Sequence, residues 1–189
     1  QNSDEEYRDI TSTLYGGTCN LPKALLYAIN GGKDEITGEL IVDGIKPLEG
    51  SVLSYSQVVK NFTLVLKKLL DIYTDSLNIV HYIHDKYAYE SSIMSMNDTV
   101  VERYVTLGIS GLSVVVDSLS AIRYSKVSVV RDENGISIDF TTEKNFPRFG
   151  RNEDSDNIIN QLKEIDTSGT ADYWMYMIEK SNGNSEEAL

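Results

Sequence analysis

The chain is poor in the residues that build covalently linked and metal-held structures. Its 189 residues include one cysteine, Cys19, and two histidines, His81 and His84. A single cysteine cannot form an internal disulfide, and so few thiol and imidazole groups give no zinc cluster. The sequence therefore predicts a fold held by packing and hydrogen bonds, in a reducing compartment.

Basic residues and long apolar runs are scarce as well. Seventeen lysines and arginines stand against 29 acidic residues, a formal charge of −12, so we expect neither a nucleic-acid nor a membrane-surface partner. No apolar run approaches the roughly 18 residues that a transmembrane helix needs. The polar start of the chain resembles neither a secretory signal nor a transit peptide. We expect a cytoplasmic protein, in which the sequons at Asn61 and Asn97 are chance matches.

What the chain does contain is typical of a globular protein, with 41% hydrophobic and 24% charged residues. Residues 1–13 are too polar to assign to an element. Asn20 and Pro22 predict the start of a short buried helix, which Gly31 and Gly32 end. A long connector, 32–53, follows, with a possible short strand at 39–42.

Helical spacing dominates the middle of the chain. A helix begins at Ser54 or Ser56 and runs to Tyr73, and a second covers 77–96, with Ile79, Val80, Ile83 and Tyr87 among its expected core residues. A third helix is expected across 109–119, with Gly108 and Gly111 marking close approach of a neighbour.

After Tyr124 the spacing of the apolar residues changes from the three- and four-residue steps of a helix to the two-residue step of a strand. Alternating apolar residues flank Asn134-Gly135 and predict a β-hairpin near 127–140. Asp156 is expected to begin a modest helix, another short helix is expected over 171–178, and the tail 181–189 is polar. The predicted fold class is α/β and mostly helical.

Generic chemical motifs are weak in this sequence. His81, His84, Asp85 and Glu90 could hold a metal only with a further ligand of suitable geometry, so hydrogen-bonded histidines on a buried helix are the favoured interpretation. Cys19 could act as a nucleophile, but a small buried hydrophobic residue is the more common role for such a cysteine. We predict no metal site.

Five stretches together resemble the pyruvate formate-lyase family of glycyl radical enzymes, in order and in spacing. They are 20–35 (NLPKALLYAINGGKDE), 77–90 (LNIVHYIHDKYAYE), 108–124 (GISGLSVVVDSLSAIRY), 130–140 (VRDENGISIDF) and 146–150 (FPRFG). The resemblance covers about residues 14–150, between a polar segment 1–13 and a diverged helical segment 151–189. After about Gln161 we expect the sequence to depart from the family.

The resemblance implies a fold and a reaction. The fold is a ten-stranded α/β barrel, of which this chain would form a partial segment. The reaction converts pyruvate and CoA to acetyl-CoA and formate through a glycyl radical and a cysteine thiyl. The resemblance also implies an arginine for the pyruvate carboxylate, a phenylalanine packed on the substrate, and a histidine placed against CoA.

Carried onto this sequence, the resemblance loses most of its chemistry. The cysteine pair falls at Gln1 and Asn2, the substrate arginine at Thr18, and the packing phenylalanine at Tyr15. The loop with the radical glycine is absent. His81, which the resemblance places at CoA, is retained, as is Phe149. Tyr15 and Thr18 would be remnants of a substrate pocket, and we predict no catalytic residue and no cofactor held by this chain alone.

Two functions follow as hypotheses. The first is a fragment or degenerate homologue of pyruvate formate-lyase, inactive alone, whose partners would be a full-length glycyl radical enzyme or complementing chains. The second is a non-catalytic binding or assembly module that binds CoA or acyl-CoA through His81, or that pairs with a full-length homologue. An unrelated enzyme built on Cys19 or the histidines is a third, lesser reading.

Overall fold

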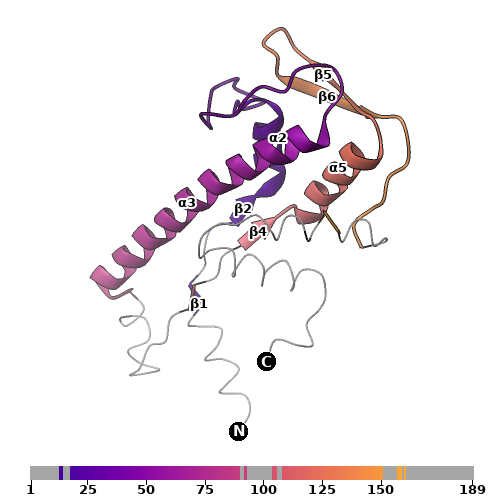
Figure 1. Cartoon of the computed structure of the whole chain (residues 1–189). Coiled ribbons are helices and arrows are strands. Elements are labelled where there is room, and N and C mark those ends of the chain that lie inside the picture. The colour runs from indigo at the N-terminus through magenta and orange to yellow at the C-terminus, as the bar shows by residue number, and fades with distance from the viewer. Residues whose placement is uncertain are drawn as a thin grey trace. The chain divides into compact units, whose positions relative to one another are not determined.

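A computed structural model describes residues 13–14, 18–89, 92, 104–105, 108–150, 157–158 and 160 (Figure 1). The elements in chain order are β1 Thr13–Leu14, β2 Thr18–Asn20, α2 Leu21–Ile29, α3 Tyr55–Tyr87, β3 Tyr104–Val105, β4 Gly108–Ser110, α5 Leu112–Tyr124, β5 Val127–Arg131 and β6 Ser137–Thr142. The α/β class is confirmed. The strands form small two-stranded sheets, β1 with β3, β2 with β4, and β5 with β6.

The chain divides into two compact units. One comprises residues 1–19 and 71–108, and the other comprises residues 20–70 and 109–189. In the first unit, β1 and β3 pair in parallel, and Gly108 donates its backbone N–H to the Tyr73 hydroxyl at 3.0 Å. None of the helices in the described ranges is both long enough and apolar enough to cross a membrane.

Helix α2 of the second unit forms as the sequence predicts. The Asn20 side chain accepts a hydrogen bond from the backbone nitrogen of Lys23 at 3.2 Å and caps the helix, and Pro22 occupies its first turn. Gly31 and Gly32 follow the helix with φ angles of +65° and +85°, a conformation that glycine adopts without strain. Most of the helix surface is buried, since Leu21, Ala24, Leu25, Ala28 and Ile29 all lie in the core.

The connector 32–53 is held against the rest of its unit. Its expected strand at 39–42 is reduced to one isolated bridge, Lys33 with Leu40. Nearer the end of the connector, the backbone nitrogen of Leu53 donates to the Val127 carbonyl at 3.0 Å. The backbone nitrogen of Val129 donates to the Ser51 carbonyl at 2.8 Å. The connector therefore adds a short backbone pairing to the edge of β5.

Helix α3 differs from the prediction of two separate helices. It runs unbroken from Tyr55 to Tyr87, because residues 74–76 contain neither glycine nor proline. It ends before Ala88, whose φ of +49° is left-handed, and not at 96. Its first half packs in the core through Val58, Phe62, Val65, Leu66 and Leu70. The expected core residues Ile79, Val80, Ile83 and Tyr87 are instead exposed.

The sequon at Asn61 lies on the buried side of α3. Asn61 is 6% exposed, and its side-chain nitrogen donates to the backbone carbonyls of Ala28 at 3.0 Å and Lys46 at 2.8 Å. This amide links α2, α3 and the connector, so it has a structural use. The sequon at Asn97 and the helix expected at 171–178 lie outside the described residues.

Helix α5 begins later than predicted. Gly108 belongs to β4, and Gly111 precedes the first helical residue with a φ of +76°, so neither glycine lies inside the helix. The close approach expected at these glycines is confirmed for Gly111, since a Cβ atom there would overlap the ring of Pro22. Helix α5 packs through Leu112, Val115, Val116, Leu119 and Ile122.

The predicted hairpin is confirmed as β5 paired antiparallel with β6, seen at the top of Figure 1. Asp132 organises its turn, because its carboxylate accepts from the backbone nitrogens of Asn134 at 2.9 Å and Ile136 at 2.8 Å. The register shifts between Val130 and Arg131. The strict alternation expected for β6 is wrong, because Ser137 is buried and Ile138 is exposed.

Candidate functional site

The described residues that were singled out from the sequence lie on separate elements. Thr18 is exposed in β2, and Tyr15 lies outside the described residues. His81 lies half-buried on α3 and has no hydrogen bond or ion pair with the described residues. Its proposed contact with CoA stays a prediction.

The histidine cluster does not form a metal site in the part of the chain that the structure describes, where no group of three or more metal-ligating side chains occurs. The ring of His84 packs edge-on against Tyr89, with centroids 5.4 Å apart and planes at 81°. Edge-to-face packing of this kind is a common stabilising contact between rings. Glu90 lies outside the described residues. The expectation of a buried helix around the histidines is wrong, because Ile79, Val80 and Ile83 beside them are exposed.

Cys19 has the environment of a structural residue. Its side chain is buried, and burial raises the pKa of the thiol to about 11. A reactive cysteine needs the opposite shift, because the thiolate is the nucleophile. The geometry therefore disfavours the hypothesis that Cys19 is a nucleophile.

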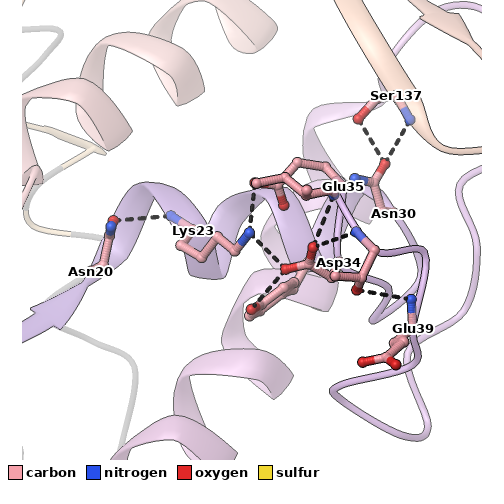
Figure 2. A network of polar contacts seen from close by, with 10 residues as sticks. Asn20, Lys23, Asn30, Asp34, Glu35, Glu39 and Ser137 are labelled. Atoms are coloured by element: carbon pink, nitrogen blue, oxygen red, sulfur yellow. Dashed lines mark hydrogen bonds and ion pairs between the residues drawn. The ribbon is translucent and has the colours of Figure 1, made fainter.

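The densest polar network joins α2 to the connector (Figure 2). The Lys23 ammonium lies 2.7 Å from the carboxylate of Asp34 and 2.6 Å from that of Glu35. Asp34 also accepts from the backbone nitrogens of Ile36 and Thr37, each at 2.9 Å. Tyr27 donates its hydroxyl to Asp34 at 3.4 Å. This network fixes the loop that leaves α2.

The network shifts the titration of its own members. Hydrogen bonds to Asp34 and Glu35 raise the pKa of the Lys23 ammonium. The hydrogen bond from Lys23, followed by those from the Thr37 and Ile36 backbone, lowers the pKa of the Asp34 carboxyl. Each shift favours the charged form. A group locked in its charged form holds structure well and exchanges protons poorly, so the network is a clamp and not a general acid or base.

A second network ties a late segment of the chain to α5. The Asp117 carboxylate accepts from the backbone nitrogen of Phe149 at 2.7 Å and lies 3.6 Å from the Arg148 guanidinium. Ser120 donates its hydroxyl to the Pro147 carbonyl at 2.7 Å. The Arg148 guanidinium also stacks 4.4 Å from the centroid of Phe146. The motif at 146–150 thus has a structural role in covering α5.

A cavity of about 560 Å³ lies among α2, α5, the hairpin and this late segment. Its lining is mainly apolar, with Asp117, Arg148, Ser118 and Thr142 as the polar exceptions. The apolar lining residues include Leu25, Leu26, Ile29, Leu53, Val114, Ala121, Ile122, Val127, Phe140 and Phe146. The Ser118 hydroxyl donates to the Val114 carbonyl at 2.7 Å, and the Asp117 carboxylate is held by Phe149 and Arg148. Neither Thr18 nor His81 is among the lining residues. It can accept an apolar group and offers no reaction centre of its own.

The sequence analysis did not identify Lys23, Asp34 and Glu35 as partners. They come from two elements joined by a turn, and no local motif marks such a triad. The only available signal was their presence in one of the five blocks of resemblance. Asp117 and Arg148 were missed for the same reason, since the contact that joins them is tertiary.

Comparison with known proteins agrees with the resemblance. The sequence model of the family described as "Pyruvate formate lyase-like" matches residues 8–177, which extends past Gln161 and beyond the 14–150 on which the resemblance rests. The chain is 46% identical over 140 residues to formate acetyltransferase 1 of Escherichia coli (strain K12). That match covers 74% of this chain and 18% of the relative's length. The chain therefore belongs to the pyruvate formate lyase-like family.

Proposed function

We propose that this chain is a scaffold segment of a pyruvate formate-lyase-type protein and does not catalyse the family's reaction by itself. The relative that it matches carries the name formate acetyltransferase, and the chain spans less than a fifth of that relative's length. Its helices and two-stranded sheets would be pieces of the larger α/β barrel that the family resemblance implies. Pyruvate and CoA would be the substrates of the complete protein.

Thr18 carries the proposal of inactivity. The resemblance puts a carboxylate-binding arginine at this position, and Thr18 is an exposed residue of β2. A guanidinium binds a carboxylate through two charge-assisted hydrogen bonds, whereas a threonine hydroxyl offers one donor and no charge. A segment of this kind would position neighbours and would not hold the substrate.

Cysteine chemistry points the same way. The resemblance places the thiyl cysteines at Gln1 and Asn2, which have no sulfur. The one thiol in the chain, Cys19, is buried and has a raised pKa. Loss of a covalent intermediate removes a whole reaction path and is not a graded defect.

A formate assay tests the proposal. Purified chain would be incubated anaerobically with pyruvate, CoA and a glycyl radical activating enzyme, with E. coli formate acetyltransferase 1 as the positive control. We expect no formate above the background without protein, and no gain in the Thr18→Arg variant. The proposal of inactivity would be overturned if the chain produced formate and kept this activity after dilution and repurification. If Cys19→Ala then abolished it, the thiol would be the catalytic group.

A further inference from the structure

The second half of α3 presents a row of exposed apolar side chains. Ile72, Ile79, Val80, Ile83 and Tyr87, here called the α3 stripe, are 66%, 60%, 39%, 40% and 57% exposed. They recur at helical steps of three, four and seven residues, so they share one face of the helix. Single exposed apolar residues are ordinary, but several on one helix face mark a surface that packs against something.

The stripe continues a face that is already used for packing. In the first half of α3, Val58, Phe62, Val65 and Tyr73 are each 8% exposed or less. Steps of seven residues lead from Val65 to Ile72 and from Tyr73 to Val80, and α3 has no break between them. One continuous amphipathic face is thus buried along its first half and exposed along its second.

A second copy of the chain would cover the stripe poorly. The stripe spans 16 residues of helix, about 24 Å at 1.5 Å per residue. A pair of such helix faces falls short of the area that a stable dimer interface usually buries, about 1,600 Å² in total. Each copy also has a formal charge of −12, which opposes self-association.

We infer that the α3 stripe is the surface on which the rest of a pyruvate formate-lyase-type polypeptide packs, namely the part outside the segment that this chain matches. The inference rests on the proposed function and adds to it a location and a partner. The match leaves most of the relative's length available to supply that cover. The partner would be an apolar face of those remaining elements.

One substitution pair in two settings tests the inference. The first setting is the 189-residue chain. The second is a chimera in which the matched 140-residue segment of E. coli formate acetyltransferase 1 is replaced by the aligned residues of this chain. Ile79→Asp with Ile83→Asp is made in both, and Leu64→Asp is the matched control, since Leu64 is a 41% exposed residue of α3 that lies off the stripe.

We expect the stripe substitutions to leave the melting temperature of the isolated chain unchanged and to lower that of the chimera clearly. A carboxylate is tolerated on an exposed helix face and is costly where the face is buried. Leu64→Asp should have little effect in either setting. Three outcomes would overturn the inference. The stripe substitutions could lower the melting temperature equally in the two settings, or Leu64→Asp could lower that of the chimera as much as they do. The third outcome is a chimera that does not fold.

Hydroxyl-radical footprinting of the unsubstituted proteins gives an independent reading. Oxidation of Ile79, Ile83 and Tyr87 should be slower in the chimera by roughly fivefold, as expected when half-exposed side chains become buried. Unchanged oxidation would contradict the inference even if the melts agreed with it.

Sedimentation of the isolated chain tests the alternative partner, a second copy of the chain. A stable dimer that the stripe substitutions dissociate would assign the stripe to that second copy and overturn the inference. The formate assay reports on inactivity alone, so failure of one proposal is distinguishable from failure of the other.

Discussion

The side-chain carbonyl of Asn30 accepts two hydrogen bonds from Ser137, one from its backbone nitrogen at 3.0 Å and one from its hydroxyl at 2.7 Å. The two residues are 107 positions apart in sequence and both are buried. They join the end of α2 to the start of β6 (Figure 2). Removal of the Asn30 carbonyl would therefore leave both donors of Ser137, its backbone nitrogen and its hydroxyl, without this acceptor.

Asn30→Ala should therefore lower the free energy of unfolding by about 1–3 kcal/mol, because two buried donors lose their acceptor. Ser137→Ala keeps the backbone hydrogen bond and should cost about 1 kcal/mol. Urea denaturation followed by far-UV circular dichroism measures both. Equal stability of Asn30→Ala and the parent chain would show that water replaces the acceptor without loss.

The clamp at Asp34 should make stability depend on pH in the acid range. The folded pKa of Asp34 is lowered, so its contribution is present above the unfolded pKa, about 3.9, and is lost as the pH falls through the folded pKa. Asp34→Asn should lower the melting temperature at pH 7, and the difference from the parent should shrink as the pH drops below about 4. Thermal melts from pH 7 to pH 3 measure this difference.

Glu49→Gln is the control for that experiment, since it removes the same charge from an exposed position of the connector. It should give no comparable difference at any pH. A deficit in Asp34→Asn that stays constant from pH 7 to pH 3 would contradict the ionic role of the carboxylate and assign the loss to packing.

Cys19 should react slowly with iodoacetamide in the folded chain. With a pKa of about 11, its thiolate fraction at pH 8 is lower than that of an ordinary cysteine, whose pKa is about 8.5, by a factor on the order of 100. Burial slows the reagent further. Mass spectrometry of the modified chain, compared with the same chain in urea, gives the ratio. Modification faster in the folded chain than in urea would restore the nucleophile hypothesis.

Two glycine substitutions separate crowding from backbone strain. Gly111 and Gly50 both have positive φ angles, +76° and +87°, but only Gly111 faces a neighbour, the ring of Pro22. Gly50→Ala should cost about 1 kcal/mol from the backbone alone, and Gly111→Ala clearly more, because α2 and α5 must also move apart. Chemical denaturation of the two variants tests the order. Equal costs would mean that the Pro22 ring yields freely.

Local signals predicted the parts of the fold that local interactions determine. Asn20 caps α2 because its own side chain reaches Lys23, three residues on. The turn of the hairpin forms because Asp132 bonds its neighbours within four residues. Both motifs need only a few adjacent residues, so one sequence was enough to find them.

Tertiary packing decided the features that the sequence did not predict. Ile79 and Ile83 have the spacing of core residues, but spacing cannot show whether a covering element is present. The spacing of apolar residues extended the predicted helix across Gly111. A glycine lowers helix propensity but does not by itself show where a helix begins. The contacts of Lys23 with Asp34 and Glu35 were not predicted, because they depend on a turn whose path no motif specified.

The buried amide of Asn61 has a consequence for how the chain is produced. Glycosylation enzymes of a secretory pathway act on Asn-X-Thr sequons in chains that are still unfolded. A sugar attached to the side-chain nitrogen of Asn61 would replace one of the two N–H groups that donate to Ala28 and Lys46, and it would place a bulky polar group at a position that is 6% exposed. Expression through a eukaryotic secretory route would yield a modified chain that cannot close its core, whereas bacterial cytoplasmic expression leaves the amide available to fold.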